Sequence, residues 1–312
     1  MKPSMTFLIT LTLLLSACAP AVAPTPVAAV APTTSSLSLI DGLNRTVTLP
    51  APAQKIVSLA PSNTEILFAI GAGAQLIGRD EFSDFPAEAK SLPSVGGSMG
   101  KYNYEQIAKL QPDLVLASSL NTPEQVKALE DLKLTVFVLA NPTTLDGMYA
   151  NLATVGILAN RSPETKKLVG ALQDRQKKVL DSLAANQTIL KVFYELDGSV
   201  PDKPFTVGAN TFIDTLIKLA GGENIGARLK GDYPQISQEE LLAQDPAIIL
   251  LGDGAYGVTV EQVAKRAGWS TLQAVKQNTI FVFDDNLVSR PGPRLIDGLE
   301  TLAKLIHPEL VK

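Results

Sequence analysis

The 312-residue chain carries 27 lysines and arginines against 31 aspartates and glutamates, so its formal net charge at pH 7 is −4. This balance argues against a nucleic-acid binder, which usually shows a basic excess. One cysteine and one histidine exclude an intramolecular disulfide and the Cys or His clusters of most zinc and iron–sulfur centres, so we expect no metal site. A hydrophobic content of 46% is typical of a packed globular protein, and the length suggests two domains of about 150 residues each.

Residues 1–17 are predicted to be a signal peptide. Lys2 gives a positive start, an apolar run covers residues 7–15, and small residues precede Cys18. This order is typical of a secretory signal, and the run is far shorter than the roughly 20 residues of a membrane-spanning helix. The tetrad Leu15-Ser16-Ala17-Cys18 resembles a bacterial lipobox, in which the cysteine becomes the lipid-bearing first residue of the mature protein. An ordinary signal peptide with an incidental cysteine is the alternative.

Residues 18–38 are predicted to be a lipidated cysteine followed by a tether. The tether consists almost entirely of alanine, proline, valine, threonine and serine, without charge or periodicity. Such a composition cannot bury a core, and its prolines keep it extended. We expect it to join a lipid anchor to a folded body that works at a membrane surface of the cell envelope, outside the cytoplasm.

The folded body begins with a predicted hairpin and continues as alternating strands and helices. Residues 37–49 alternate around the turn signal Asp41-Gly42. Further strands are predicted at residues 56–59, 75–78, 114–117, 136–139, 191–196, 248–251 and 280–283. Strands that alternate with helical patterns favour α/β units with parallel pairing.

Three patterns occur twice in the same order, which indicates two related lobes. The pairs are Asn63-Thr64-x-Ile66 with Asn210-Thr211-x-Ile213, Asn103-x-Glu105 with Ser237-x-Glu239, and Thr135-Val136-Phe137-Val138 with Thr279-Ile280-Phe281-Val282. We therefore predict an α/β fold with two similar lobes and parallel-rich sheets, an N-terminal lobe over residues 39–160 and a C-terminal lobe over residues 188–312.

Residues 161–187 are predicted to form a long helix that links the lobes. Ser162 is expected at the N-cap and Pro163 at the first helical position. Apolar residues at 168, 172, 179 and 183 keep one face apolar over about six turns. We expect a stiff spine, with an ordinary packing helix of one domain as the alternative.

No motif in the chain predicts an enzyme, so no catalytic residues are expected. His307 precedes Pro308 at a predicted helix end, where a histidine usually contacts carbonyl groups, and no nucleophile elbow accompanies it. Trp269 is interpreted as a packing residue.

Two segments of the N-terminal half are candidates for ligand binding. Pro61, Ser62 and Asn63 follow a strand and open a helix, so their polar groups can face a ligand, although helix capping alone would explain Ser62 or Asn63. The loop Phe82-Ser83-Asp84-Phe85-Pro86 places aromatic rings where they can hold a flat or apolar ligand, with local packing as the alternative.

Further candidates lie in three other loops. Met99 and Tyr102 stand among glycines, where they can form a wall of a ligand site or coordinate haem iron. Tyr233 holds the matching place in the second half. Arg290 offers a positive charge to an anionic ligand, whereas Arg294 is interpreted as a solvated helix-start residue.

Glu105 and Glu239 occupy matching places in the two halves, in the first turn of a helix after a polar N-cap. Stabilisation of the helix dipole explains each of them separately. Their symmetry favours a second interpretation, in which the two carboxylates bind arginines of a two-subunit partner.

Several of these segments together resemble a known family. They are Ile56-Val57-Ser58-Leu59-Ala60-Pro61-Ser62-Asn63-Thr64-Glu65, Phe82-Ser83-Asp84-Phe85-Pro86, Leu110-x-Pro112-Asp113-Leu114-Val115, Ala220-Gly221-Gly222-Glu223-Asn224-Ile225 and Tyr233-Pro234-Gln235-Ile236-Ser237. They resemble the helical-backbone class of substrate-binding lipoproteins of ABC importers, which serves vitamin B12, ferric siderophores and haem. The resemblance extends over about residues 37–308.

The resemblance implies a ligand cleft between the lobes and a monomer that delivers a metal-chelate nutrient to a permease dimer with its ATPase subunits. It also implies that Glu105 and Glu239 bind arginines of that permease. The Ser-Asp-aromatic-Pro loop and the aromatic-Pro-Gln-x-Ser stretch resemble the cobalamin binders most. A ferric siderophore, contacted by Arg290 and Tyr102, is the first alternative and haem the second. A surface-anchored α/β enzyme is the alternative of a different class.

Overall fold

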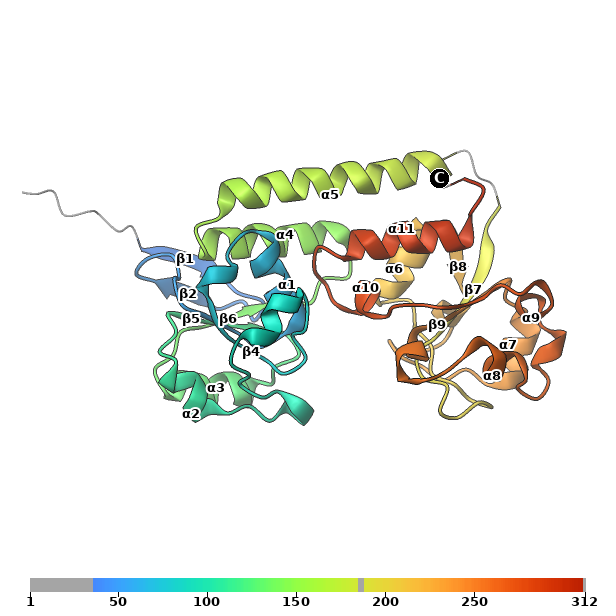
Figure 1. The fold of residues 1–312 in the computed structure, drawn as a ribbon, viewed down its shortest axis with the longest axis horizontal. Coiled ribbons are helices and arrows are strands. Elements are labelled where there is room, and N and C mark those ends of the chain that lie inside the picture. Colours follow the sequence, from blue (N-terminus) through green and yellow to red (C-terminus); the bar gives the residue numbers. More distant parts are fainter. Residues whose placement is uncertain (1–35, 185–187, 311–312) are drawn as a thin grey trace, which may run out of the picture. The chain divides into compact units, whose positions relative to one another are not determined.

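The computed structural model describes residues 36–184 and 188–310, and Ser35–Lys312 forms one compact unit (Figure 1). The predicted signal peptide, Cys18 and nearly all of the predicted tether lie outside the described residues. No described helix combines the length and the hydrophobicity that a membrane span requires.

The N-terminal lobe contains a hairpin and a four-stranded parallel sheet. Strands β1 (Leu37–Ile40) and β2 (Thr46–Leu49) pair antiparallel, as the alternating residues predict. The sheet has the order β4-β3-β5-β6. Its strands are β3 (Ile56–Ser58), β4 (Leu76–Arg79), β5 (Leu114–Ser118) and β6 (Val136–Leu139), each within a residue of the apolar run that predicts it.

The C-terminal lobe repeats this topology in a second parallel sheet. The order is β8-β7-β9-β10, so in both lobes the first strand lies between the second and the third. The strands are β7 (Leu190–Glu195), β8 (Gly222–Asn224), β9 (Ile248–Leu251) and β10 (Ile280–Val282). The prediction of two lobes with parallel sheets is thus confirmed. Strand β8 was not predicted, because Gly222-Glu223-Asn224 has no apolar residue and reads as the end of a helix.

Helices cover both faces of each sheet. They are α1 (Pro61–Ala69), α2 (Tyr104–Lys109), α3 (Pro123–Asp131), α4 (Leu145–Leu158), α5 (Ser162–Leu183), α6 (Phe212–Leu219), α7 (Gln238–Gln244), α8 (Val260–Ala264), α9 (Gln273–Gln277), α10 (Asn286–Ser289) and α11 (Leu295–Ile306). Short 3₁₀ turns lie at Gly73–Gln75, Ala87–Ser91, Ser98–Gly100, Ile225–Arg228, Gly252–Tyr256 and Trp269–Thr271.

One hydrophobic core extends through both lobes. Alternate residues of both sheets, such as Leu116 on β5 and Leu250 on β9, face it together with buried residues of α1, α4, α5, α6 and α11. The opposite face of each sheet has its own core, against α2 and α3 in the N-terminal lobe and against α7, α8 and α9 in the C-terminal lobe. The lobes are therefore joined by packing as well as by the chain.

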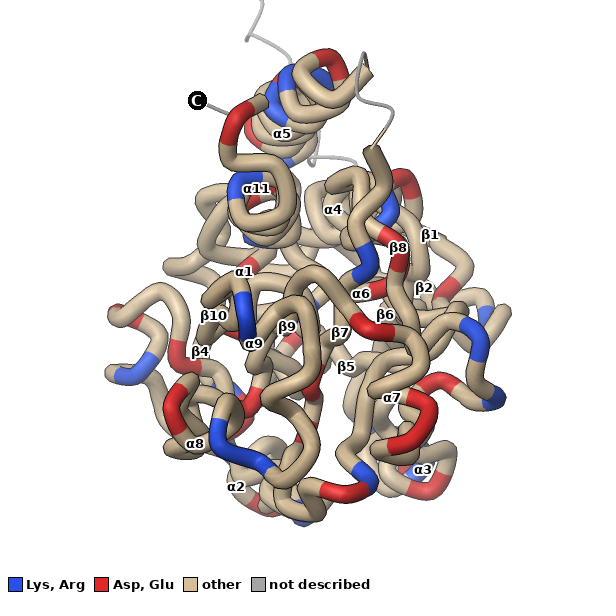
Figure 2. Tube along the Cα trace, turned by 90° about the vertical axis from the view of Figure 1, so that its right-hand side faces the viewer, with Lys and Arg blue, Asp and Glu red and all other residues tan. Residues whose placement is uncertain are grey.

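Helix α5 lies along both lobes as the predicted spine. Figure 2 shows it over α4 and α11. Its own residues Leu172 and Val179 are buried in the core. Arg175 of α5 pairs with Asp297 at 2.5 Å and with Glu300 at 2.6 Å, both on α11. The predicted capping residue is wrong by one position. Arg161 is the N-cap and forms no side-chain cap bond, and Ser162 is the first helical residue.

Candidate functional site

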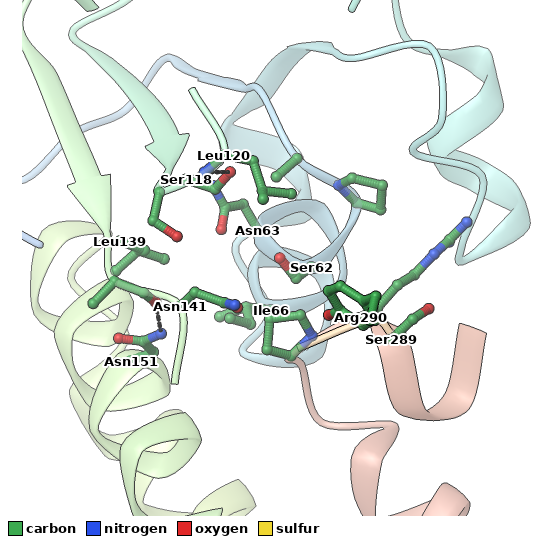
Figure 3. A pocket seen from close by; sticks show the side chains of 16 residues that line it. Ser62, Asn63, Ile66, Ser118, Leu120, Leu139, Asn141, Asn151, Ser289 and Arg290 are labelled. Atoms are coloured by element: carbon green, nitrogen blue, oxygen red, sulfur yellow. Dashed lines mark hydrogen bonds between the residues drawn. The ribbon is translucent and has the colours of Figure 1, made fainter. Parts of the chain in front are cut away.

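A cavity of about 230 Å³ lies between the carboxyl ends of three N-terminal strands and two segments of the C-terminal lobe (Figure 3). Ligands of parallel α/β sheets characteristically bind outside the carboxyl ends of the strands. The lining residues are Ala60, Pro61, Ser62, Asn63, Ile66, Ser118, Ser119, Leu120, Leu139, Ala140, Asn141, Asn151, Tyr233, Ser289, Arg290 and Pro291. Five of the ten predicted ligand-binding residues are among them: Pro61, Ser62, Asn63, Tyr233 and Arg290.

Helix α1 brings Ser62 and Asn63 to the cavity. The N-cap is Ala60 and forms no side-chain cap bond, so the capping interpretation of both residues is wrong. The Nδ2 of Asn63 donates to the carbonyl oxygens of Leu116 at 3.1 Å and Ala117 at 3.0 Å, which braces the end of β5. Among the described residues none donates to its Oδ1, so that oxygen can accept a hydrogen bond from a ligand.

The loops after β5 and β6 supply lining residues that the sequence analysis missed. Leu120 is 84% exposed at the cavity, and Ser118 ends β5 beside it. After β6, the Nδ2 of Asn151 on α4 donates to the Ala140 carbonyl oxygen at 2.8 Å and fixes that loop. The sequence signal for these lining residues is a polar residue at or just beyond the end of a buried strand, as at Ser118 and Asn141.

The loop at residues 82–86 lies outside the cavity lining. Ser83 is fully buried, where its hydroxyl donates to the Asp80 carboxylate and lies 2.8 Å from the Thr64 hydroxyl. Burial raises the pKa of Asp80, although the hydrogen bond from Ser83 counteracts it. Phe82 is 54% exposed, and Asp84 forms an ion pair with Arg290.

Met99 and Tyr102 also lie outside the lining. Met99 is 90% exposed. The Tyr102 hydroxyl donates to the Leu59 carbonyl oxygen at 3.1 Å and accepts from the Asn121 side chain at 3.0 Å, and burial raises its pKa. Tyr102 therefore holds the loop after β5 in place.

The C-terminal lobe supplies Tyr233 and Arg290 to the cavity. Tyr233 is 56% exposed, and its pKa is raised by partial burial and by the nearby carboxylates of Asp232 and Asp285. The Arg290 side chain is only 15% exposed and pairs with Asp84 at 2.7 Å and Glu65 at 3.3 Å. Its charge is thus already compensated.

The interpretation of Arg294 as a solvated residue is wrong. Its side chain is 13% exposed rather than solvated, because Nε and Nη2 bind the Glu65 carboxylate at 2.8 and 2.6 Å. The guanidinium also lies over the Phe85 ring, 4.1 Å from its centroid.

Glu105 and Glu239 occupy equivalent positions in the two lobes. Each is the second residue of its helix, α2 or α7, after an N-cap side chain that accepts a backbone hydrogen bond. Both side chains are exposed, and neither forms an ion pair with a described residue. A surface depression of about 540 Å³ adjoins Glu105. The two carboxylates are therefore available to a partner.

The remaining residues considered from the sequence serve packing. His307 is the C-cap of α11, 1% exposed, with Nε2 at 3.1 Å from the Gly221 carbonyl oxygen. Trp269 is fully buried and packs edge-on against Phe193. Within residues 36–184 and 188–310, no group of three or more His, Cys, Asp and Glu side chains could hold a metal ion.

Comparison with known proteins gives consistent similarities. Residues 56–287 match the family described as periplasmic binding protein. An uncharacterized ABC transporter substrate-binding lipoprotein of Bacillus subtilis is 32% identical over 88% of this chain and 87% of its own length. The vitamin B12-binding protein of Vibrio cholerae is 30% identical over 80% of this chain and 88% of its own. The crystal structure of a periplasmic haem-binding protein from Pseudomonas aeruginosa has a TM-score of 0.72 and 26% identity, covering 83% of this chain and 94% of that one.

Proposed function

Because the chain belongs to the periplasmic binding protein family as a substrate-binding protein of an ABC transporter, we propose that it captures a corrinoid such as cobalamin and delivers it to the permease. The cavity at the carboxyl ends of β3, β5 and β6 carries this proposal. Its volume of about 230 Å³ is below the roughly 300–1,000 Å³ of sites that enclose a drug-sized ligand. A corrinoid would therefore extend out of the cavity, between the rims of the two lobes.

The chemistry of the cavity suits a large, mostly neutral ligand. Leu120 and Tyr233 present exposed side chains from opposite lobes, and an aromatic face beside an aliphatic one suits the rim of a macrocycle. Asn63, Asn141 and Asn151 bring amide groups to the lining, which can pair with the carboxamides of a corrinoid. The relative from Vibrio cholerae, named a vitamin B12-binding protein, supports the same ligand.

The surroundings of Arg290 and Tyr102 argue against an anionic iron chelate held by those two residues. Arg290 is neutralised by Asp84 and Glu65, and the Tyr102 hydroxyl is bonded within the N-terminal lobe. Haem remains an outcome of the binding test, because Tyr233 could offer a phenolate to haem iron and a haem-binding protein shares the fold.

We also propose that Glu105 and Glu239 bind arginines of the two permease subunits, one carboxylate per lobe. Their exposure, their equivalent helix positions and their lack of ion-pair partners in the described part of the chain support this role. The double variant Glu105→Lys with Glu239→Lys should abolish uptake and leave ligand affinity unchanged. The matched control is Glu124→Lys with Glu261→Lys, which reverses two exposed first-turn glutamates on α3 and α8. Equal uptake by both double variants would refute the docking role.

For the chain's location, we propose export, removal of residues 1–17 and lipid attachment to Cys18, with residues 19–38 as the tether. The chain would then act as a monomer at the cell envelope and bind its ligand without turnover. Cys18→Ser should release the protein from the membrane fraction, whereas its affinity for the ligand should not change.

The ligand is tested by calorimetry of the full chain with cyanocobalamin, ferric hydroxamates, ferric catecholates and haem. A one-to-one complex with cobalamin at sub-micromolar Kd, about −8 kcal/mol or stronger, would support the proposal. Binding of haem or a siderophore but not cobalamin would refute the corrinoid and keep the receptor function. A Tyr233→Ala variant with unchanged affinity would refute the location of the site.

A further inference from the structure

Four charged side chains join the two lobes beside the cavity. Glu65, on α1 of the N-terminal lobe, accepts two hydrogen bonds from Arg294 at 2.8 and 2.6 Å. Arg290 donates to the same carboxylate at 3.3 Å and to Asp84 at 2.7 Å. Both arginines lie in the segment that connects α10 to α11, and both of these helices pack against α6 of the C-terminal lobe. These bonds therefore cross from one lobe to the other.

The centre of this inter-lobe cluster is shielded from water. The Glu65 side chain is 1% exposed, and the two guanidinium side chains are 13% and 15% exposed. The segment that carries them lies close to α1, because a β-carbon added at Gly292 would be 3.6 Å from Glu65 Oε2 and 3.7 Å from the Ser62 carbonyl oxygen. Separating the lobes here would leave a buried charge without its partner, which is strongly unfavourable.

We propose that Glu65 is a positioning residue for ligand binding, which fixes the separation of the lobes and holds Arg290 in the wall of the cavity. Without the Glu65 charge, the only ion pair left to either arginine would be that of Arg290 with Asp84, and the carboxylates of Asp80 and Asp284 would act on the two guanidinium groups only from farther away. Their mutual repulsion would move residues 290–294 away from α1 and widen the cavity. The inference rests on the proposed function only in treating this cavity as the ligand site.

The C-terminal lobe contains a matched control for this cluster. Glu195 at the end of β7 is fully buried and is bound by both terminal nitrogens of Arg266. Glu195→Gln and Glu65→Gln thus each remove one negative charge from a buried ion pair between a glutamate and an arginine. Only the Glu65 pair joins the lobes, because Glu195 and Arg266 belong to one lobe.

The test measures the distance between the lobes directly. The chain has one cysteine, so in the Cys18→Ser variant two introduced cysteines are the only sites that a spin label can modify. Lys127→Cys on α3 and Glu261→Cys on α8 are exposed and lie in different lobes. Pulsed electron–electron double resonance without ligand should give a narrow distribution of distances between the two labels, both for the otherwise native chain and for Glu195→Gln. For Glu65→Gln we expect a shift of several ångströms to longer distance, and at least about tenfold weaker binding of cyanocobalamin.

Each outcome decides the matter. An unchanged distance distribution in folded Glu65→Gln would overturn the proposal, and so would an equal shift in Glu195→Gln. If Glu65→Gln does not fold, Arg294→Gln is judged by the same criterion, because it removes the other half of the bidentate pair and does not line the cavity. The distance measurement needs no ligand, so a failure of cobalamin to bind would refute the corrinoid without affecting this result.

Discussion

Replacing Asn63 by aspartate tests the brace between α1 and β5. The two side chains have the same shape, but an ionised carboxylate only accepts hydrogen bonds. Asn63 is 2% exposed, and its Nδ2 donates to the carbonyl oxygens of Leu116 and Ala117 at 3.1 and 3.0 Å. The substitution therefore places an acceptor against two acceptors in a buried site, beside the cavity.

The magnitude depends on pH. When the introduced carboxyl group is protonated, it can donate one hydrogen bond, whereas the amide donates two. Below about pH 4 the free energy of unfolding should therefore fall by about 1 kcal/mol, the net value of one hydrogen bond. Above that pH the folded state must keep the proton or accept a buried charge, and each unit by which the pKa rises costs about 1.4 kcal/mol. Buried carboxyl groups shift by up to roughly 3–5 units, so near pH 7 we expect a total loss of about 5 kcal/mol.

The sign follows from linkage. The pKa of the introduced carboxyl group is raised in the folded state, so the variant loses stability as pH rises from the unfolded-state pKa to the folded-state pKa, and then remains constant. Urea unfolding between about pH 4 and pH 8 measures this, with the fluorescence of Trp269, the only tryptophan, as the signal. Asn141→Asp is the control, because Asn141 is exposed at the same cavity. A constant difference between Asn63→Asp and the native chain across this range would refute the reasoning.

Three further substitutions test other contacts. Arg175→Gln removes a half-exposed ion-pair network between α5 and α11, so it should lower the free energy of unfolding by about 1 kcal/mol at low salt and by less at high salt. Burial raises the pKa of Asp253, whose buried Oδ1 accepts no hydrogen bond from the described residues. The contribution of Asp253 to stability therefore falls as pH rises above about 4, and Asp253→Asn should stabilise the chain by about 1 kcal/mol near pH 7 and not below pH 4, as urea unfolding can check. A β-carbon in Gly208→Ala would overlap the Gly231 carbonyl oxygen, so it should displace the segment that carries Tyr233 and weaken ligand binding by about tenfold in calorimetry.

Local patterns predicted the strands well because strand formation depends on short apolar runs. All the predicted runs form strands within a residue of the expected limits, and the repeated motifs correctly indicated two lobes of the same topology. Strand β8 was missed because it is held by its neighbour β7 rather than by an apolar sequence of its own. A local pattern also explains why Pro61–Asn63 could be predicted as a candidate for ligand binding. A strand followed at once by a helix start places these residues at the carboxyl end of the strand, and there they line the cavity.

The side chains that depend on the other lobe could not be predicted in this way. Glu65 reads as a helix residue and Arg294 as a solvated one, yet they pair across 229 residues of sequence. The same limit applies within the N-terminal lobe to Ser83, which stands in an aromatic loop but is fully buried, with its hydroxyl against the side chains of Asp80 and Thr64. Such partners are set by tertiary contacts, for which one sequence carries no local signal.

The core that passes through both lobes bears on how the chain folds and on how it can have diversified. The two lobes have the same topology, yet they share one of their hydrophobic cores. A chain cut near residue 160 would expose the apolar face of α4 that now packs against α5, and the apolar residues of α1 that share a core with α6 and α11. The halves have become interdependent, so the protein should unfold in one cooperative transition. Substitutions along α4, α5 and α11 are constrained by the shared core, whereas the loops around the cavity lie outside that constraint.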